Sequence, residues 1–335
     1  MSDEQTTQKL MRKLLAVCSN PDDDESAIKA AADLADIWQA DLSILLAVDR
    51  PAELSRMADA TGVSTEELEQ RLLDQQRESL ASMIERVLPG RDPNLQVSMG
   101  TRFIDIIRKV IEEDIDLVVK AAEELHGIHR YLFASTDQHL LRKCPCPVWL
   151  RLNDSAKSVN TVLAAVDVDE AMANEPETLA DLNRRIMETA QQIAGSTGAD
   201  LHILHVWDAP GEGLVRLWSD AADSKAVAAA YVAEVQSTHW KSLQKLVEKA
   251  NESADALTKQ PVKMEIHLER GKARDVIPEQ VHKLKTDILV MGTIARTGVP
   301  GFIIGNTAED ILNSVDCSVV TVKPSSYISP VAGMD

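Results

Sequence analysis

Two neighbouring segments in the second half of the chain carry residue types that suit a phosphorylated ligand. An apolar run ending at Met291 is followed by Gly292, and the loop after it closes with Gly305, Asn306 and Thr307 at the start of a helix. Glycine lets the backbone turn tightly, and the first turn of a helix offers free N–H groups to an anion. The pattern indicates a phosphate site, unless Asn306 or Thr307 only caps the helix and the glycines only turn the loop.

An acidic residue marks the end of another apolar run in the same half. The run 162–167 passes through Ala165 and ends in Asp167. In an open parallel sheet the binding crevice lies past the carboxyl ends of the strands, where the connections change direction. The sequence therefore predicts a crevice shared by this strand end and by the strand that ends near Gly292.

The elements that position these residues follow from one long internal repeat. Residues 14–18 match 163–167, and residues 40–48 match 199–206. Further matches, in the same order, pair Gly100, Asp105, 116–119, Thr136, Leu141 and 146–149 with Gly271, Asp275, 287–290, Thr307, Leu312 and 317–320. Islands that keep one order along both halves indicate a duplicated domain.

Each half is predicted to alternate short buried strands with helices. Strands are expected at 14–18, 42–48, 95–99, 115–119 and 147–151, and again at 162–167, 201–207, 262–268, 287–291 and 318–323. Helices are expected at 26–35, 65–87, 102–113 and 136–143, and at 225–256, 273–284 and 307–314. Continuous apolar strands that alternate with helices indicate a parallel sheet covered on both faces. The domains are predicted as 1–152 and 161–335, joined by the polar linker 153–160.

The layout and the loop resemble the universal stress protein family, and the tandem arrangement resembles its E-type bacterial members. The family's nucleotide loop is a glycine, two residues, a glycine, nine residues, a glycine and a small polar residue. Gly292, Gly305 and Asn306 match it in spacing, whereas Ala295 replaces the middle glycine. The resemblance implies an α/β fold with two tandem flavodoxin-like (adenine nucleotide alpha hydrolase-like) domains. Each has a five-stranded parallel sheet, and the fifth strands pair edge to edge about a pseudo-twofold axis.

The resemblance also implies a site for ATP or another adenine nucleotide in the second half. Asp167 and Val206 would frame the adenine and ribose, and the loop residues would hold ribose and phosphates. The expected binding residues are Ala165, Asp167, Val206, Met291, Gly292, Ala295, Gly305, Asn306 and Thr307. The family has branches that bind ATP and branches that do not, and the methyl group of Ala295 either is tolerated near a phosphate or closes the pocket.

The first half lacks the pieces of such a site. In the repeat, Cys18 stands where Asp167 does, and Lys120 stands where Gly292 does. We therefore expect the first half not to bind ATP in the family's manner. Lys120 is interpreted as a solvated lysine at the rim, in preference to a contact for some other anionic ligand.

Several histidines and cysteines are close enough in the sequence to be candidates for a metal or redox site. His126 and His129 lie on one loop, but ordinary surface histidines are favoured over a zinc site there, because zinc needs three or four converging ligands. His202 and His205 lie three apart on a strand, so they face opposite sides and do not share a metal. Cys146 is interpreted as core filling, with its neighbour Cys144 partly exposed.

Composition excludes several classes of function. The chain has 335 residues and a net charge of −18, which both halves share. Such a field repels phosphate backbones and anionic lipid, so no nucleic acid and no membrane is expected as a partner. The first residues show no secretory pattern, which favours the cytoplasm. An enzyme is disfavoured, since no P-loop and no acidic metal cluster is visible.

The expected function is a stress-response sensor of adenine nucleotide, built as an intramolecular pseudo-dimer that is compatible with further homodimerisation. Two alternatives remain open from the sequence. One is a scaffold, or a binder of another small ligand, and the other is a slow ATP hydrolase. Trp149, on the last strand of the first half, is expected to pack between the halves, whereas Trp207 either lines the nucleotide site or only packs on its strand.

Overall fold

A computed structural model describes residues 10–19, 24–123, 135–152, 158–219, 223–254, 262–294 and 305–333. These ranges contain one continuous sheet in the order β3-β2-β1-β4-β5-β10-β9-β6-β7-β8. Every neighbouring pair is parallel except β5 and β10, which are antiparallel and join the two halves. The predicted fold class and the predicted pairing of the fifth strands are confirmed.

The strands lie close to their predicted positions. In the first half they are β1 (Lys13–Cys18), β2 (Asp41–Asp49), β3 (Asn94–Gly100), β4 (Leu117–Ala121) and β5 (Val148–Arg151). In the second half they are β6 (Thr161–Val166), β7 (Asp200–Trp207), β8 (Met264–Arg270), β9 (Ile288–Gly292) and β10 (Ser318–Val322). The central strands are almost wholly buried, as strands with helices on both faces must be.

Helices cover both faces of the sheet. The first half contributes α1 (Glu25–Trp38), α2 (Leu54–Thr61), α3 (Thr65–Val87), α4 (Arg102–Glu113) and α5 (Ser135–Lys143). The second contributes α6 (Pro176–Thr197), α7 (Glu212–Trp218), α8 (Ser224–Ala254), α9 (Ala273–Leu284) and α10 (Asn306–Leu312). Helices α1, α3, α6 and α8 pack on one face, and α4, α5, α9 and α10 pack on the other. None of the described helices is long and apolar enough to cross a membrane.

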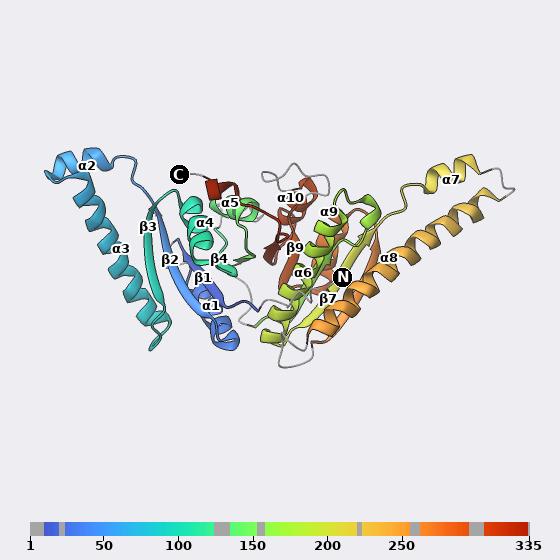
Figure 1. Cartoon of the computed structure of the whole chain (residues 1–335), viewed down its shortest axis with the longest axis horizontal. Coiled ribbons are helices and arrows are strands. Elements are labelled where there is room, and N and C mark those ends of the chain that lie inside the picture. Colours follow the sequence, from blue (N-terminus) through green and yellow to red (C-terminus); the bar gives the residue numbers. More distant parts are fainter. Residues whose placement is uncertain are drawn as a thin grey trace, which may run out of the picture.

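Two short helices extend the ends of the molecule. Helices α2 and α3 form one end and α7 and α8 form the other (Figure 1). Neither α2 nor α7 was predicted from the sequence. In α7 the indole of Trp218 is exposed, so the apolar side of this helix is not used for core packing.

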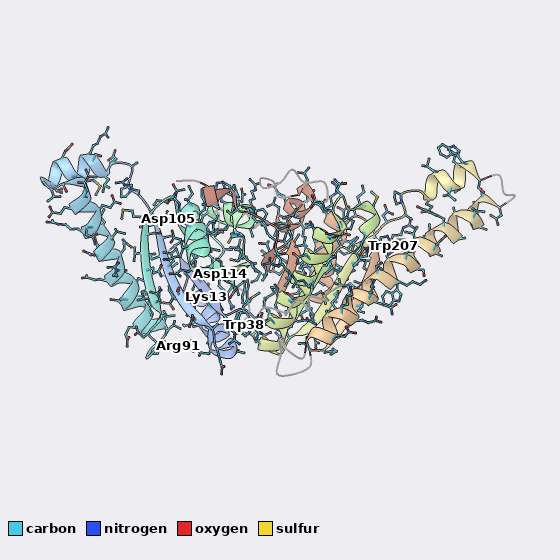
Figure 2. The ribbon with its side chains drawn as sticks, in the orientation of Figure 1. Lys13, Trp38, Arg91, Asp105, Asp114 and Trp207 are labelled. Carbon is cyan, nitrogen blue, oxygen red and sulfur yellow. The ribbon has the colours of Figure 1, made fainter. Side chains whose placement is uncertain are left out.

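Contacts beyond the sheet also hold the halves together. The indole N–H of Trp38, at the end of α1, donates a hydrogen bond to the hydroxyl of Ser196 in α6, and Figure 2 shows Trp38 toward the middle of the molecule. Trp149 is buried beside Val320 in the β5–β10 pair, which confirms its predicted place between the halves. The contact between α1 and α6 and the pairing of β5 with β10 make the junction part of the core.

The first strands of the two halves correspond with a shift of one residue from the predicted repeat. In each half one carboxylate accepts hydrogen bonds from two successive backbone N–H groups that open the first strand. The sets are Asp116 with Arg12 and Lys13, and Asp287 with Asn160 and Thr161. Lys13 therefore corresponds to Thr161, and Ser19 corresponds to Asp167. The predicted match of Cys18 with Asp167 is wrong, because Cys18 occupies the buried position of Val166.

The fourth strands require a second correction of one residue. Val118 lies beside Val148 in one half, as Leu289 lies beside Val319 in the other. Lys120 therefore corresponds to Met291, and the residue that stands at the position of Gly292 is Ala121. The first correction arises in a strand whose buried residues are all apolar, where adjacent registers look alike. The second restores the register that the predicted match of 116–119 with 287–290 already implies.

Candidate functional site

The predicted site would lie at the carboxyl ends of β6 and β9, where the chain connections of the second half change direction. Strand β6 has β7 on one side and β9 on the other, and Ala165 lies beside Met291. The chain runs from β6 outward to β7 and β8 and then returns to β9, so the carboxyl ends of β6 and β9 form a topological switch point. This arrangement brings the predicted residues Asp167 and Gly292 to the same edge of the sheet.

The loop after β6 holds Asp167 through a residue that the sequence did not indicate. The backbone N–H of Asp167 donates to Oδ1 of Asn183 at 3.0 Å, and Nδ2 of Asn183 donates to the carbonyl oxygen of Asp167 at 2.6 Å. Oδ1 of Asp167 accepts from the N–H of Asp169 at 3.2 Å. Asn183 is buried in α6, so this helix holds the backbone of Asp167 in place at the end of β6. Asn183 is one of three buried amide side chains in α6, and nothing in the sequence separates it from Gln191 and Gln192.

Gly292 is required by packing and not by a left-handed turn. It is absent from the described residues with positive φ. A Cβ atom built on Gly292 would lie 2.7 Å from Cδ2 of Leu182 and 3.2 Å from its Cγ. The missing side chain therefore lets α6 approach the carboxyl end of β9 closely, which corrects the predicted role of this glycine.

The described ends of the loop between β9 and α10 meet beside the carboxyl end of β9. The N–H of Gly305 donates to the carbonyl oxygen of Thr293 at 3.1 Å. Gly305 is the N-cap of α10 and makes no side-chain cap, while Asn306 and Thr307 are exposed. The alternative in which one of these two residues caps the helix is wrong. Ala295 lies outside the described residues.

The buried side chain of Lys323 contacts the first residue of this loop. Nζ of Lys323 donates to Oγ1 of Thr293 at 2.8 Å and to the carbonyl oxygen of Leu141, in the first half, at 2.6 Å. Burial lowers the pKa of Lys323 from its ordinary value to about 8. The end of β9 is thus tied to the junction between the halves by a single ammonium group.

The other predicted residues lie on β6 and β7 at the same edge of the sheet. Val206 is half-buried on the face covered by α9. Trp207 is buried at the end of β7, near α8 (Figure 2), with the guanidinium of Arg270 over its ring and His239 beside it. Trp207 therefore packs on its strand. Of the two predicted roles, strand packing fits this burial better than lining of the nucleotide site.

In the first half, an ion pair occupies the region that corresponds to the loop of the second half. Nζ of Lys120 lies 2.9 Å from Oδ1 of Asp137 and 3.0 Å from Oε1 of Glu123. The side chains of Lys120 and Asp137 are fully buried, so the prediction of a solvated rim lysine was wrong. Burial alone lowers the pKa of Lys120, but the two carboxylates outweigh it and raise the pKa. Asp137 corresponds to Ala308, so the second half has neither partner.

The other candidates are resolved only in part. Cys144 and Cys146 are both buried, so the expected partial exposure of Cys144 was wrong. His202 and His205 face opposite sides of the sheet, as predicted, because their ring nitrogens contact His267 and His239 respectively. The loop with His126 and His129 lies outside the described residues.

These features define a protein of two tandem flavodoxin-like α/β units joined through their last strands. The model of the Universal stress protein family matches residues 11–150 and 162–323. The chain therefore belongs to the universal stress protein family.

Known relatives agree with the tandem arrangement. Universal stress protein E of Escherichia coli K12 is 27% identical over 230 residues, which are 68% of this chain and 67% of that one. The crystal structure of PA1789 from Pseudomonas aeruginosa PAO1 is 23% identical, covers 94% of this chain and 93% of that one, and has a TM-score of 0.60. A universal stress protein solved in complex with cAMP, 19% identical, covers half of this chain and all of that one, with a TM-score of 0.33. The resemblance to E-type members is confirmed.

Proposed function

We propose that this chain is a cytoplasmic stress-response protein whose second half binds an adenine nucleotide, ATP in the first instance. The observation that carries the proposal is the convergence of Asp167, Gly292 and Gly305 on one switch point of the sheet. Ala165, Val206 and Met291 would contribute the apolar wall, and Ala295, Asn306 and Thr307 the phosphate loop. Asp167 would accept hydrogen bonds from the ribose or the base, and backbone N–H groups would face the phosphates.

The two halves support different roles in this proposal. The second half keeps an acidic residue and a glycine at the two strand ends, and no side chain of Gly305 competes for the first N–H groups of α10. The first half has Ser19 and Ala121 at the corresponding positions and a buried ion pair beside them. We therefore assign nucleotide sensing to the second half and a structural role to the first.

The first test identifies what the purified protein carries. The full chain is denatured and the released small molecules are analysed by mass spectrometry. Recovered adenine nucleotide supports the proposal, and an unrelated metabolite indicates a pocket that binds another ligand. If the protein releases no small molecule, binding is tested by titration.

The second test titrates the full chain with a fluorescent ATP analogue. Asp167→Ala is expected to weaken binding about tenfold to a hundredfold, since it removes hydrogen bonds to a charged acceptor. Asp59→Ala, on the exposed face of α2, is the matched control and should leave affinity unchanged. Absence of saturable binding to the wild-type chain, or equal binding by Asp167→Ala, would contradict the proposed site. Phosphate release that is lost in Asp167→Ala would instead indicate a slow hydrolase.

A further inference from the structure

Three metal-ligating side chains meet on the outer strands of the second half. In the register of β7 and β8, His202 lies beside Glu265 and Leu204 lies beside His267. Because residues two apart on a strand share a face, all three ligating side chains project from the same side of the sheet. That side is the one on which α9 packs, through Ile277 and Val281.

The ligand atoms are already close to one another. Nδ1 of His202 lies 2.8 Å from Nε2 of His267, and carboxylate oxygens of Glu265 lie 3.9 Å and 3.8 Å from these two nitrogens. The histidine side chains are only 12% and 13% exposed, whereas that of Glu265 is 58% exposed. The arrangement has two fixed imidazoles inside and a movable carboxylate at the solvent side.

From this geometry we propose that His202, Glu265 and His267 bind one divalent transition-metal ion of the zinc type. Two imidazole nitrogens and one carboxylate oxygen favour zinc and its neighbours over calcium or magnesium, which prefer oxygen ligands. Zinc–nitrogen bonds of about 2.0–2.1 Å in a tetrahedral site separate the nitrogens by about 3.3 Å. The rings therefore need to part by about half an ångström, and the exposed Glu265 reaches the ion by a rotamer change.

The first half of the chain supplies an internal comparison. The register of β2 and β3 places Ser43 beside Asn94 and Leu45 beside Gln96, so Ser43, Asn94 and Gln96 correspond to the three proposed ligands. They make ordinary hydrogen bonds: Asn94 Nδ2 donates to Ser43 Oγ at 3.3 Å, and Gln96 Nε2 donates to Glu113 Oε1 at 3.0 Å. The same place in the fold is thus filled by hydroxyl and amide groups in one copy and by metal-ligating groups in the other.

The electrostatics of the histidine pair suit metal binding. Burial and the neighbouring His202 both lower the pKa of His267, the direction that favours the neutral imidazole, which is the form that ligates a metal. Near them, Glu265 and Glu269 carry negative charge and Lys283 of α9 carries positive charge.

The proposed metal site is separate from the proposed nucleotide site. His202 is the third residue of β7, and Val206 lies four residues further along the strand. At about 3.3 Å per residue, the two positions are about 13 Å apart. Strand β8 is also the edge of the sheet, so an ion bound there would fasten the outermost strand to β7. Zinc binding can therefore be tested without reference to nucleotide.

The experiment titrates zinc into the chelator-treated, tag-free full chain by calorimetry. Its central variant, His202→Ser/Glu265→Asn/His267→Gln, installs the set that the first half already accommodates at these positions. The wild-type chain should bind one more equivalent of zinc than this variant, whose affinity at the site should fall at least about 100-fold. His282→Gln removes an exposed histidine on α9 and should leave the binding unchanged.

A reciprocal variant and the absorption spectrum of bound cobalt(II) complete the test. Ser43→His/Asn94→Glu/Gln96→His places the three ligands in the first half and should add one equivalent of zinc. Circular dichroism establishes that each variant is folded. The proposal is overturned if the wild-type chain binds no zinc, if the central variant binds it equally well, or if bound cobalt(II) shows thiolate absorption, which would assign the metal to the buried cysteines.

Discussion

Nζ of Lys120 lies 2.9 Å from Oδ1 of Asp137, and neither side chain reaches solvent. The pair joins the end of β4 to the first turn of α5. At the corresponding positions the second half carries Met291 and Ala308, so one copy of the domain has a buried ion pair where the other has apolar packing. The comparison gives a direct way to measure what the ion pair contributes.

Lys120→Met should destabilise the protein by about 3–5 kcal/mol, because it leaves the buried carboxylate of Asp137 without its partner. Asp137→Ala should destabilise the protein less, because the carboxylate of Glu123 remains 3.0 Å from Nζ of Lys120. The double variant Lys120→Met/Asp137→Ala, which installs the residues of the second half, should recover most of the loss. Urea unfolding followed by circular dichroism measures all three, and additive losses in the double variant would contradict the interpretation of a coupled pair.

The second prediction concerns the packing of Gly292 at the end of β9. Gly292→Ala should destabilise by about 1–2 kcal/mol, since its Cβ would lie 2.7 Å from Cδ2 of Leu182. Shortening the neighbour in Gly292→Ala/Leu182→Val should cost less than the two single changes together.

The control for this prediction is Gly213→Ala in α7. A Cβ atom there has no neighbour within 4 Å, so the substitution should be neutral or stabilise by up to about 1 kcal/mol through helix propensity. Thermal or urea unfolding of the four variants would test the assignment. Equal effects at Gly292 and Gly213 would show that the contact with Leu182 does not determine the residue at the strand end.

The sequence predicted the order of elements and even some of their ends. Helices α4 and α9 lie at the predicted residues 102–113 and 273–284, because amphipathic spacing and flanking residues define a helix locally. The residue-by-residue correspondence between the two halves was harder to predict from the sequence. In a strand buried on both faces every position is apolar, so Cys18 and Ser19 were not distinguishable as counterparts of Asp167 without the backbone hydrogen bonds made by Asp116.

The parts of the site that the sequence missed depend on partners far along the chain. Asn183 lies sixteen residues from Asp167, and the burial of Lys120 depends on Asp137, which is one polar residue among several on α5. The metal-ligating set was missed for the same reason, since His202 and His267 become neighbours only when β7 pairs with β8. A lone histidine or lysine on an apolar strand does not reveal which distant side chain it meets.

The buried ammonium group of Lys323 makes stability depend on pH in the alkaline range. Its pKa is about 8 in the folded protein and near the ordinary 10.5 in the unfolded chain. Between these values the unfolded chain binds more protons than the folded one, so the free energy of unfolding should rise with pH. The rise between about pH 7.5 and pH 9.5 should be about 2 kcal/mol.

Lys323→Met isolates this contribution, because the difference in stability between wild type and variant cancels groups that titrate alike in both. The difference should move in favour of the wild type as the pH rises, even if the loss of hydrogen bonds to Thr293 and Leu141 shifts it by a constant amount. Lys272→Met, at an exposed lysine, should show no such trend. Urea unfolding at several pH values measures the slope, and a flat difference for Lys323→Met would mean that the ammonium group keeps its ordinary pKa in the folded protein.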